Sequence, residues 1–135
     1  MCPQLPLVER FGCVGDSAVC EASTMERIAP IFAVRDLDRA LDFYRRLGFA
    51  VRRYRGGGYG FASRHGIELH LGAVPDDDRR TSAAYLFVDD ADRVAAEWES
   101  AGAEVHPPQD TEWEMHEGAL VDPDGNVIRF GSPIR

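Results

Sequence analysis

Hydrophobic residues recur along the chain in short blocks whose spacing changes from strand-like to helix-like and back. Residues 28–34 are apolar and predict a buried strand. Asp36 follows as a helix N-cap, and apolar residues then recur at helical spacing until Gly48, where the helix is predicted to end. Three strands are predicted next, over residues 49–55, 59–63 and 67–74, with Gly56–Gly58 as a turn.

The same order of elements begins again after residue 80. Residues 34–51 read VRDLDRALDFYRRLGFAV and residues 88–105 read VDDADRVAAEWESAGAEV, which match at an offset of 54 positions. The shared residues include the caps Asp36 and Asp90 and the helix-ending Gly48 and Gly102. Because these positions set local geometry, we interpret the match as an internal repeat of one strand, one helix and three strands. The second copy is predicted to include strands over 83–88, 114–121 and 126–131, with a turn at DPDG, residues 122–125.

Two such repeats predict an α+β fold. Neither repeat buries both faces of its sheet alone, so we expect a curved mixed sheet, a half-barrel with helices outside and a concave face within. The domain is predicted to span residues 26–135, with repeats over 27–75 and 80–133 and a polar linker over 75–80. Residues 1–25 show no clear period and are expected to form a poorly ordered N-terminal extension.

The composition fits one globular domain of 135 residues, of which 44% are hydrophobic. No apolar run approaches the roughly 20 residues that span a bilayer, and the first residues lack the basic and apolar pattern of a secretory signal. We therefore expect a cytoplasmic protein with no membrane partner. The cysteines Cys2, Cys13 and Cys20 have no metal or disulfide spacing and are expected to be reduced.

The formal net charge of −8 disfavours nucleic acid as a partner, because phosphate binding needs a clustered cationic surface. A cationic small molecule would be attracted, although solubility alone explains the same charge. An arginine cluster also stands on this acidic chain, and we interpret it as a solvated helix end and hairpin. An anionic ligand group or salt bridges between subunits are the alternatives. The cluster comprises Arg45, Arg46, Arg52, Arg53 and Arg55.

The helix opening AVRDLDRALDFYRRLGF and the closing segment DPDGNVIRF, together with the repeat, resemble the vicinal-oxygen-chelate superfamily over about residues 26–133. This superfamily includes glyoxalase I, extradiol dioxygenases, fosfomycin-resistance enzymes and bleomycin-resistance proteins. The stretches GIELHLGAV, AAEW and TEWEMHEGALVDPDGNVIRF are most similar to the bleomycin-resistance group. The resemblance implies that a second chain completes the cavity, so we expect a homodimer.

The resemblance also places the metal ligands of the superfamily's enzymes at four positions, which here hold Ala29, Glu68, Ala83 and Arg129. Alanine has no donor atom, and arginine stays protonated. One carboxylate does not hold a divalent cation in a site that uses three or four ligands, so neither a metal nor another cofactor is expected. Glu68 and Arg129 are instead predicted to face each other as an ion pair.

The bleomycin-resistance proteins sandwich a planar part of their ligand between two aromatic side chains, and the resemblance places Tyr59 and Trp113 at these positions. His70 and Tyr85 are expected to line the same wall. The predicted ligand-binding residues are Tyr59, Phe61, Glu68, His70, Tyr85, Trp113, Met115 and Arg129. Trp98 stands on the second helix and is predicted to belong to the core.

These observations favour a metal-free binding protein without catalytic residues, which sequesters a planar, cationic, antibiotic-like ligand in a cleft at a dimer interface. The first alternative is an enzyme that acts on a small metabolite. It would be a divergent glyoxalase-like lyase or isomerase that uses Glu68 and His70 as acid and base groups, or a dioxygenase-type enzyme. The second is an interaction module that has lost the pocket. The missing metal ligands disfavour the enzyme, and the aromatic pair disfavours the interaction module.

Overall fold

The computed structural model describes residue 23 and residues 25–134 of the chain. The first repeat consists of β1 (Ile31–Val34), α3 (Leu37–Arg46), β2 (Ala50–Arg53), β3 (Tyr59–Arg64) and β4 (Ile67–Ala73). A short 3-10 helix, η1 (Asp76–Asp78), leads to the second repeat. The second repeat consists of β5 (Ala83–Phe87), α4 (Ala91–Ser100), β6 (Glu104–Asp110), β7 (Met115–Val121) and β8 (Val127–Pro133).

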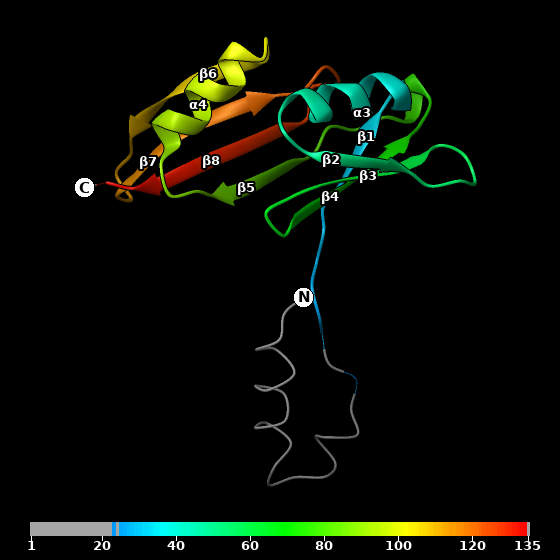
Figure 1. Ribbon diagram of the computed structural model, residues 1–135, viewed down its shortest axis with the longest axis horizontal. Helices are drawn as coiled ribbons and strands as arrows, with labels where there is room; N and C mark the ends of the chain where they lie inside the picture. Colours follow the sequence, from blue (N-terminus) through cyan, green and yellow to red (C-terminus); the bar gives the residue numbers. More distant parts are fainter. Residues whose placement is uncertain (1–22, 24, 135) are drawn as a thin grey trace, which may run out of the picture.

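Each repeat folds into its own four-stranded sheet, with strand orders β1-β4-β3-β2 and β5-β8-β7-β6 (Figure 1). In both sheets the first strand pairs in parallel with the last, and the other pairs are antiparallel. The predicted α+β fold with two βαβββ repeats is therefore confirmed. The sequence predicted one curved sheet, whereas the described residues form two. The sheets are separate because β1 and β5 are edge strands, each paired only within its own repeat.

The helices begin and end where the sequence predicts. The side chains of Asp36 and Asp90 each accept a hydrogen bond of 3.1 Å from the backbone N–H three residues further on. Gly48 and Gly102 follow the helices with φ values of 95° and 89°, a left-handed conformation that favours glycine. The same cap and the same stop, 54 positions apart, thus define two helices of equal length.

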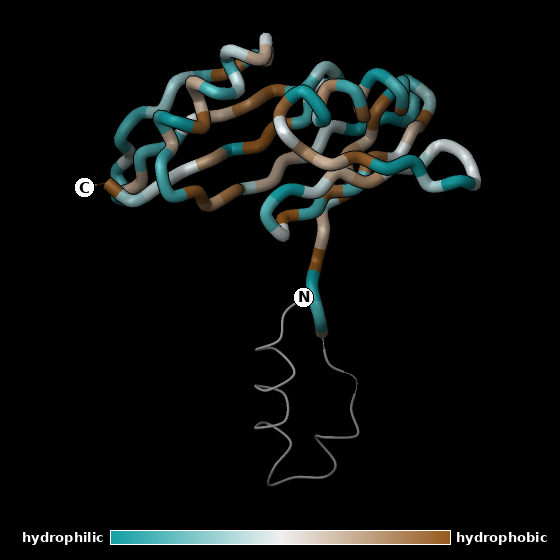
Figure 2. Tube along the Cα trace, in the orientation of Figure 1, coloured by the Kyte–Doolittle hydropathy of each residue, from teal (hydrophilic) through white to brown (hydrophobic). Residues whose placement is uncertain are grey.

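The hydrophobic core lies between the helices and the sheets, and both repeats contribute to it. Both helices cover the same side of the two sheets and leave the opposite side uncovered (Figure 1). In Figure 2 the strands carry most of the hydrophobic stretches, whereas the helices alternate with hydrophilic residues. Trp98 of α4 is 2% exposed and packs edge-on against Phe130 at 5.3 Å, so its predicted place in the core is confirmed.

The predicted buried strand over residues 28–34 is wrong for its first three residues, which precede β1. Strand β1 starts only at Ile31, and Ile28 is 94% exposed. Burial alternates within β1, because only one face of its sheet is covered by a helix. Phe32 is fully buried, whereas Ile31 is 57% exposed.

Two further predictions concern segments outside the sheets. Residues 75–80, predicted as a linker, contain the 3-10 helix η1. The expected N-terminal extension lies almost entirely outside the described residues, and the three cysteines lie outside them altogether.

Buried polar contacts join the two repeats at the DPDG turn. The hydroxyl of Tyr44 on α3 donates to Asp122 at 2.9 Å, and the side-chain amide of Asn126 donates to the carbonyl of Ala33 at 2.9 Å. Asp124 is 3% exposed and accepts hydrogen bonds from the backbone N–H and the guanidinium of Arg35. The turn therefore holds the second sheet against β1 and α3.

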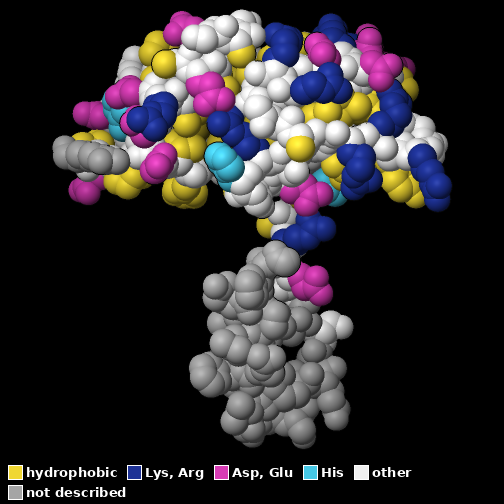
Figure 3. Space-filling model, in the orientation of Figure 1, with side chains coloured by type: hydrophobic (Ala, Val, Ile, Leu, Met, Phe, Trp, Pro, Cys, Tyr) yellow, Lys and Arg dark blue, Asp and Glu magenta, His cyan; other side chains and the backbone are white. Residues whose placement is uncertain are grey.

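Arginine side chains gather mainly over the first repeat (Figure 3). Arg45 and Arg46 pair with Asp42, and Arg53 pairs with Asp38. These contacts agree with the interpretation of a solvated helix end and hairpin for this part of the arginine cluster. No helix among the described residues is both long enough and apolar enough to cross a membrane.

Candidate functional site

The side of the sheets that faces away from the helices, which we call the open face, carries the predicted ligand-binding residues. Leu69 and Leu71 of β4 are buried in the core, so Glu68 and His70 point to the open face, because side chains alternate along a strand. The same alternation places further residues on this face. They are Tyr59 and Phe61 of β3, Tyr85 and Phe87 of β5, Met115 and Glu117 of β7, and Arg129 of β8.

On the first sheet, Tyr59, His70 and Glu68 form a continuous chain of hydrogen bonds. The hydroxyl of Tyr59 lies 2.8 Å from His70 Nδ1, and His70 Nε2 lies 3.0 Å from Glu68 Oε2. The hydrogen bond from His70 and, to a smaller extent, the charge of Arg27 hold the pKa of the Glu68 carboxyl below its usual value. A carboxylate beside Nε2 favours the tautomer with its proton there, so Nδ1 is left to accept a hydrogen bond from the Tyr59 hydroxyl.

Aromatic rings surround this hydrogen-bond chain. Phe61 lies edge-on to His70, with 4.8 Å between ring centroids, and edge-on to Tyr59 at 5.6 Å. The guanidinium of Arg52 on β2 lies over the Phe61 ring, 4.2 Å from its centroid. Arg52 therefore belongs to the candidate site, whereas Arg45 and Arg46 lie on α3, on the covered side.

On the second sheet, Glu117 is the centre of a separate cluster. Its Oε1 accepts hydrogen bonds from the Tyr85 hydroxyl at 2.9 Å and from Trp113 Nε1 at 3.1 Å. Its Oε2 lies 3.4 Å from the guanidinium of Arg129. Burial and the hydrogen bond to Glu117 raise the pKa of Tyr85 to about 12, so this phenol remains a hydrogen-bond donor.

Sequence reasoning missed Glu117 and Gly131. Gly131 lies opposite Glu117 in the β7–β8 pair, and a Cβ atom there would overlap the Tyr85 hydroxyl. The glycine therefore leaves the space through which Tyr85 reaches Glu117 across β8. The alternation along MHEGALV was the available signal, because it places Glu117 on the same face as Met115.

The predicted ion pair between Glu68 and Arg129 is wrong. Glu68 pairs with Arg27 and His70 on the first sheet. Arg129 pairs with Glu117 on the second sheet. The two residues thus lie on different sheets, and each has another partner.

The strand registers show why these two residues do not correspond. Ile31 on β1 lies opposite His70 on β4, and Tyr85 on β5 lies opposite Arg129 on β8. Ile31 and Tyr85 are repeat partners at the offset of 54 positions. The residue of the first repeat that corresponds to Arg129 is therefore His70, two positions after Glu68.

The two residues predicted to sandwich a ligand lie far apart within one chain. Tyr59 begins β3 beside the β2–β3 hairpin, whereas Trp113 lies in the β6–β7 hairpin. These hairpins are at opposite ends of the molecule (Figure 1). A single chain therefore does not bring both rings onto one ligand, and the predicted sandwich requires a second chain.

The residues present do not fit the metal that the superfamily's enzymes use. Ala29 and Ala83 offer no side-chain donor, and the guanidinium of Arg129 remains a cation. Among the residues that the structure describes, no group of three or more His, Cys, Asp and Glu side chains could hold a metal ion. Glu68 and His70 supply two donors, fewer than a protein zinc site uses.

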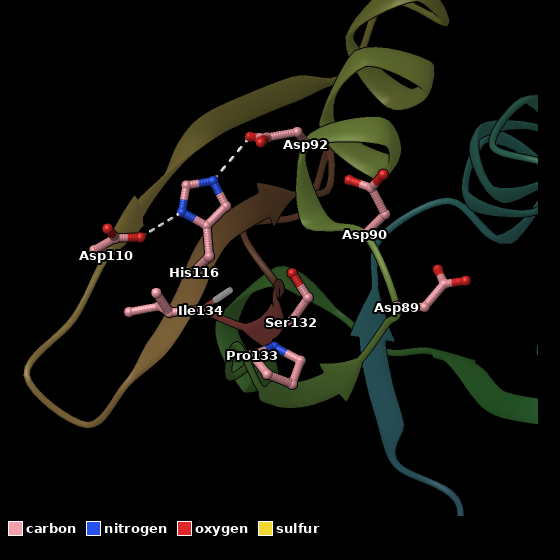
Figure 4. Close-up of a pocket in the computed structure, with 8 residues that line it drawn as sticks. All are labelled: Asp89, Asp90, Asp92, Asp110, His116, Ser132, Pro133 and Ile134. Atoms are coloured by element: carbon pink, nitrogen blue, oxygen red, sulfur yellow. Dashed lines mark hydrogen bonds and ion pairs between the residues drawn. The ribbon is translucent and has the colours of Figure 1, made fainter.

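A second polar cluster lies on the helix side of β7, in a hollow of about 390 Å³ (Figure 4). His116 Nδ1 lies 2.8 Å from Asp110 and its Nε2 lies 2.9 Å from Asp92. These hydrogen bonds, the one to Asp92 most strongly, raise the pKa of His116 above its usual value. His116 and Glu117 point to opposite faces of the sheet, so this hollow is distinct from the open face.

The family model described as the Glyoxalase/Bleomycin resistance protein/Dioxygenase superfamily matches residues 25–130. The chain belongs to this superfamily. The resemblance seen in the sequence, including its tendency toward the bleomycin-resistance group, is thereby confirmed.

Individual relatives match the chain over the whole domain. A bleomycin resistance protein of Klebsiella pneumoniae is 31% identical over 115 residues, which cover 78% of this chain and 90% of the relative. The crystal structure of a bleomycin-binding protein complexed with bleomycin has 29% identity and a TM-score of 0.70, and the match covers 80% of this chain and 98% of that one. A bleomycin resistance determinant encoded on the transposon Tn5 has 28% identity and a TM-score of 0.71, with 81% and 98% covered.

Proposed function

We propose that this protein binds a planar, cationic antibiotic of the bleomycin type and withholds it from its target without changing it. The observation that carries the proposal is the exposed aromatic surface of the open face, where Trp113 is 64% and Phe87 is 76% exposed. Core packing does not account for such exposure, and flat aromatic rings suit stacking on a planar ligand. The relatives named for bleomycin resistance or binding support the same ligand class.

The proposal includes a homodimer in which Tyr59 of one chain and Trp113 of the other enclose the ligand. Its support is the placement of these two residues at opposite ends of one chain (Figure 1). A twofold axis would set the first sheet of one chain against the second sheet of the other and would form two equivalent clefts. The same pairing would cover Ile31 and Phe87, which are 57% and 76% exposed on the open face.

Charge supports a cationic ligand. The chain has a formal net charge of −8, and the Glu117 carboxylate lies beside the exposed rings. Arg129 approaches Glu117 at 3.4 Å, and its side chain is 58% exposed. A ligand cation would therefore be attracted at long range by the net negative charge of the chain.

The test is a calorimetric titration of the purified full chain with metal-free bleomycin, combined with sedimentation. We expect one ligand per chain, a dissociation constant of about 1 μM or less, and a dimer at micromolar protein concentration. Binding should need no added zinc, nickel or manganese, and the recovered ligand should keep its mass. Absence of binding would contradict the proposal that the ligand is of the bleomycin type. A protein that stays monomeric when saturated with ligand would contradict the proposal that two chains form the cleft.

A second candidate function is an acid–base enzyme, and the hydrogen-bond chain from Tyr59 through His70 to Glu68 is the observation that favours it. Such a chain moves a proton from a phenol to an imidazole that is oriented by a carboxylate. The titration distinguishes the two functions through the recovered compound. Chemical change that His70→Asn abolishes would favour the enzyme, and unchanged ligand would favour sequestration.

A further inference from the structure

Three side chains on the second sheet converge on the carboxylate of Glu117. Tyr85 and Trp113 donate to Oε1 at 2.9 and 3.1 Å, and Arg129 lies 3.4 Å from Oε2. The Glu117 side chain is only 7% exposed. A carboxylate this deeply buried needs hydrogen-bond donors, and the two aromatic side chains supply them. The orientation of both rings is therefore tied to one acidic group.

The hydrogen bond to Glu117 is most important for the orientation of Trp113. This residue is 64% exposed and lies in the hairpin between β6 and β7, next to Glu114, whose φ is 67°. An exposed indole in a turn samples several rotamers, and ordering it during ligand binding lowers the affinity. The hydrogen bond from Trp113 Nε1 to Glu117 restricts the ring before any ligand arrives.

Tyr85 reaches the same carboxylate across β8, over the space left by Gly131. Because its pKa is raised to about 12, its hydroxyl remains protonated and keeps donating under ordinary solution conditions. The ring of Tyr85 also lies 4.9 Å from that of Phe87, measured between centroids. A change in the orientation of Tyr85 would therefore reach Phe87 as well.

We propose that Glu117 is a positioning residue, whose carboxylate holds Trp113 and Tyr85 in the orientation in which they stack on a planar ligand. The inference rests on the proposed function for the nature of the ligand. The orientation of Trp113, however, can be measured in the ligand-free protein. Glu117→Ala removes the acceptor, whereas Glu117→Gln keeps the shape and one neutral acceptor, which forms weaker hydrogen bonds than a carboxylate.

The first measurement is an NMR spectrum of the indole N–H groups in the 15N-labelled full chain. The chain has two tryptophans, and Trp98 is the internal reference, because it is 2% exposed and its Nε1 donates to the carbonyl of Leu47. In Glu117→Ala we expect only the Trp113 signal to shift and its proton to exchange faster with water. Glu117→Gln should give a smaller shift, and Trp113→Phe assigns the signal.

The matched control is Glu112→Gln. Glu112 is exposed, lies in the same hairpin and loses the same charge on substitution, but it is not an acceptor for Trp113 in the structure. We expect both indole signals of this variant to coincide with those of the wild type. An equal shift in Glu112→Gln and Glu117→Gln would assign the effect to net charge and would overturn the inference.

The second measurement is the affinity for bleomycin. We expect a loss of about tenfold in Glu117→Ala, a loss of about threefold in Glu117→Gln and no change in Glu112→Gln. An unmoved Trp113 signal in Glu117→Ala overturns the inference, and so does a moved signal with unchanged affinity. Should Glu117→Ala fail to fold, Glu117→Gln decides both points. If the wild-type protein binds no bleomycin, the proposed function and the ligand part of the inference fail together, and the indole signals alone decide whether Glu117 orients Trp113.

Discussion

At the scale of single residues, the two tryptophans show that the role of a side chain depends on its burial and its hydrogen-bond partner. Trp98 is 2% exposed, contacts Phe130 and donates to a backbone carbonyl. Trp113 is 64% exposed and donates to a carboxylate on the open face. Substitution of the first therefore acts on stability, whereas substitution of the second acts on the surface that we propose for ligand binding.

Replacement of Trp113 or Tyr59 by alanine should weaken bleomycin binding and leave the fold intact. Each substitution removes one stacking surface, and the loss of an aromatic anchor typically lowers affinity by about tenfold to thirtyfold. The melting temperature should fall less than in Trp98→Ala, because neither residue belongs to the buried core and Glu117 keeps Tyr85 and Arg129 as partners when Trp113 is removed. Calorimetric titration and thermal unfolding of the same samples measure the two effects separately.

Trp98→Ala is the matched control. The cavity left in the core should reduce the free energy of unfolding by about 3–5 kcal/mol. Any folded fraction of this variant should still bind the ligand. A protein that unfolds on substitution of Trp113 but tolerates Trp98→Ala would show that the two tryptophans have been assigned to the wrong roles.

At the scale of secondary-structure elements, His116 joins three of them. Its ring lies on β7 and forms hydrogen bonds with Asp110 at the end of β6 and with Asp92 in the first turn of α4 (Figure 4). Both ring nitrogens donate only when the imidazole is protonated. Asp89 and Asp90 line the same hollow, and β8 contributes the uncharged Ser132. The surroundings of His116 are therefore acidic from the β6 and α4 sides.

This arrangement predicts a loss of stability as the pH rises. The folded-state pKa of His116 lies above the ordinary histidine value of about 6.5. The stability that its protonated ring contributes is therefore fully present below about pH 6.5 and is lost as the pH rises through the folded-state pKa. The effect should amount to about 0.5–1 kcal/mol, as is usual for partly exposed ion pairs. Urea unfolding at about pH 6 and about pH 9 should show this difference, and His116→Asn should lack it.

His106→Asn is the control for this experiment. His106 pairs with Glu104 at 3.3 Å, but its side chain is 63% exposed, whereas that of His116 is 27% exposed. We expect its removal to leave the pH dependence of the unfolding midpoint close to that of the wild type. Equal pH dependence in the wild type and in His116→Asn would contradict the prediction.

At the scale of the whole molecule, a few buried polar groups join the two repeats beside the hydrophobic core that they share. The Tyr44 hydroxyl reaches Asp122 in the turn before β8, and Trp98 of α4 donates to the carbonyl of Leu47 at the end of α3. Tyr44 is fully buried and Asp122 is 4% exposed. An unpaired acceptor at this depth is costly, so the two sheets are held in one relative orientation.

Tyr44→Phe should therefore reduce the free energy of unfolding by about 1–3 kcal/mol, because the buried carboxylate of Asp122 loses one donor. The matched control is Tyr54→Phe, since Tyr54 is 54% exposed and its substitution should change stability by no more than about 0.5 kcal/mol. Urea unfolding of both variants measures the difference. Equal stability of the two variants would mean that the hydroxyl of Tyr44 does not contribute to the contact between the repeats.

The sequence by itself determined the local features of this protein. The caps Asp36 and Asp90 and the terminating Gly48 and Gly102 are found where the pattern predicts, because each acts through hydrogen bonds within a few residues. Period-two alternation likewise defined which residues of a strand share a face. The resemblance to the superfamily was also visible in the sequence, because it rests on motifs of consecutive residues such as DPDGNVIRF.

Only the tertiary structure decided which of these residues meet. His70 lies 39 positions after its partner Ile31, whereas Arg129 lies 44 positions after Tyr85, so the two repeats connect their paired strands through segments of different length. The offset that aligns the helices therefore fails for the last strands. The contacts of Glu117 likewise depend on three strands and a hairpin of the second repeat. Strand register and sheet packing join segments distant in the sequence, and neither is fixed by local spacing.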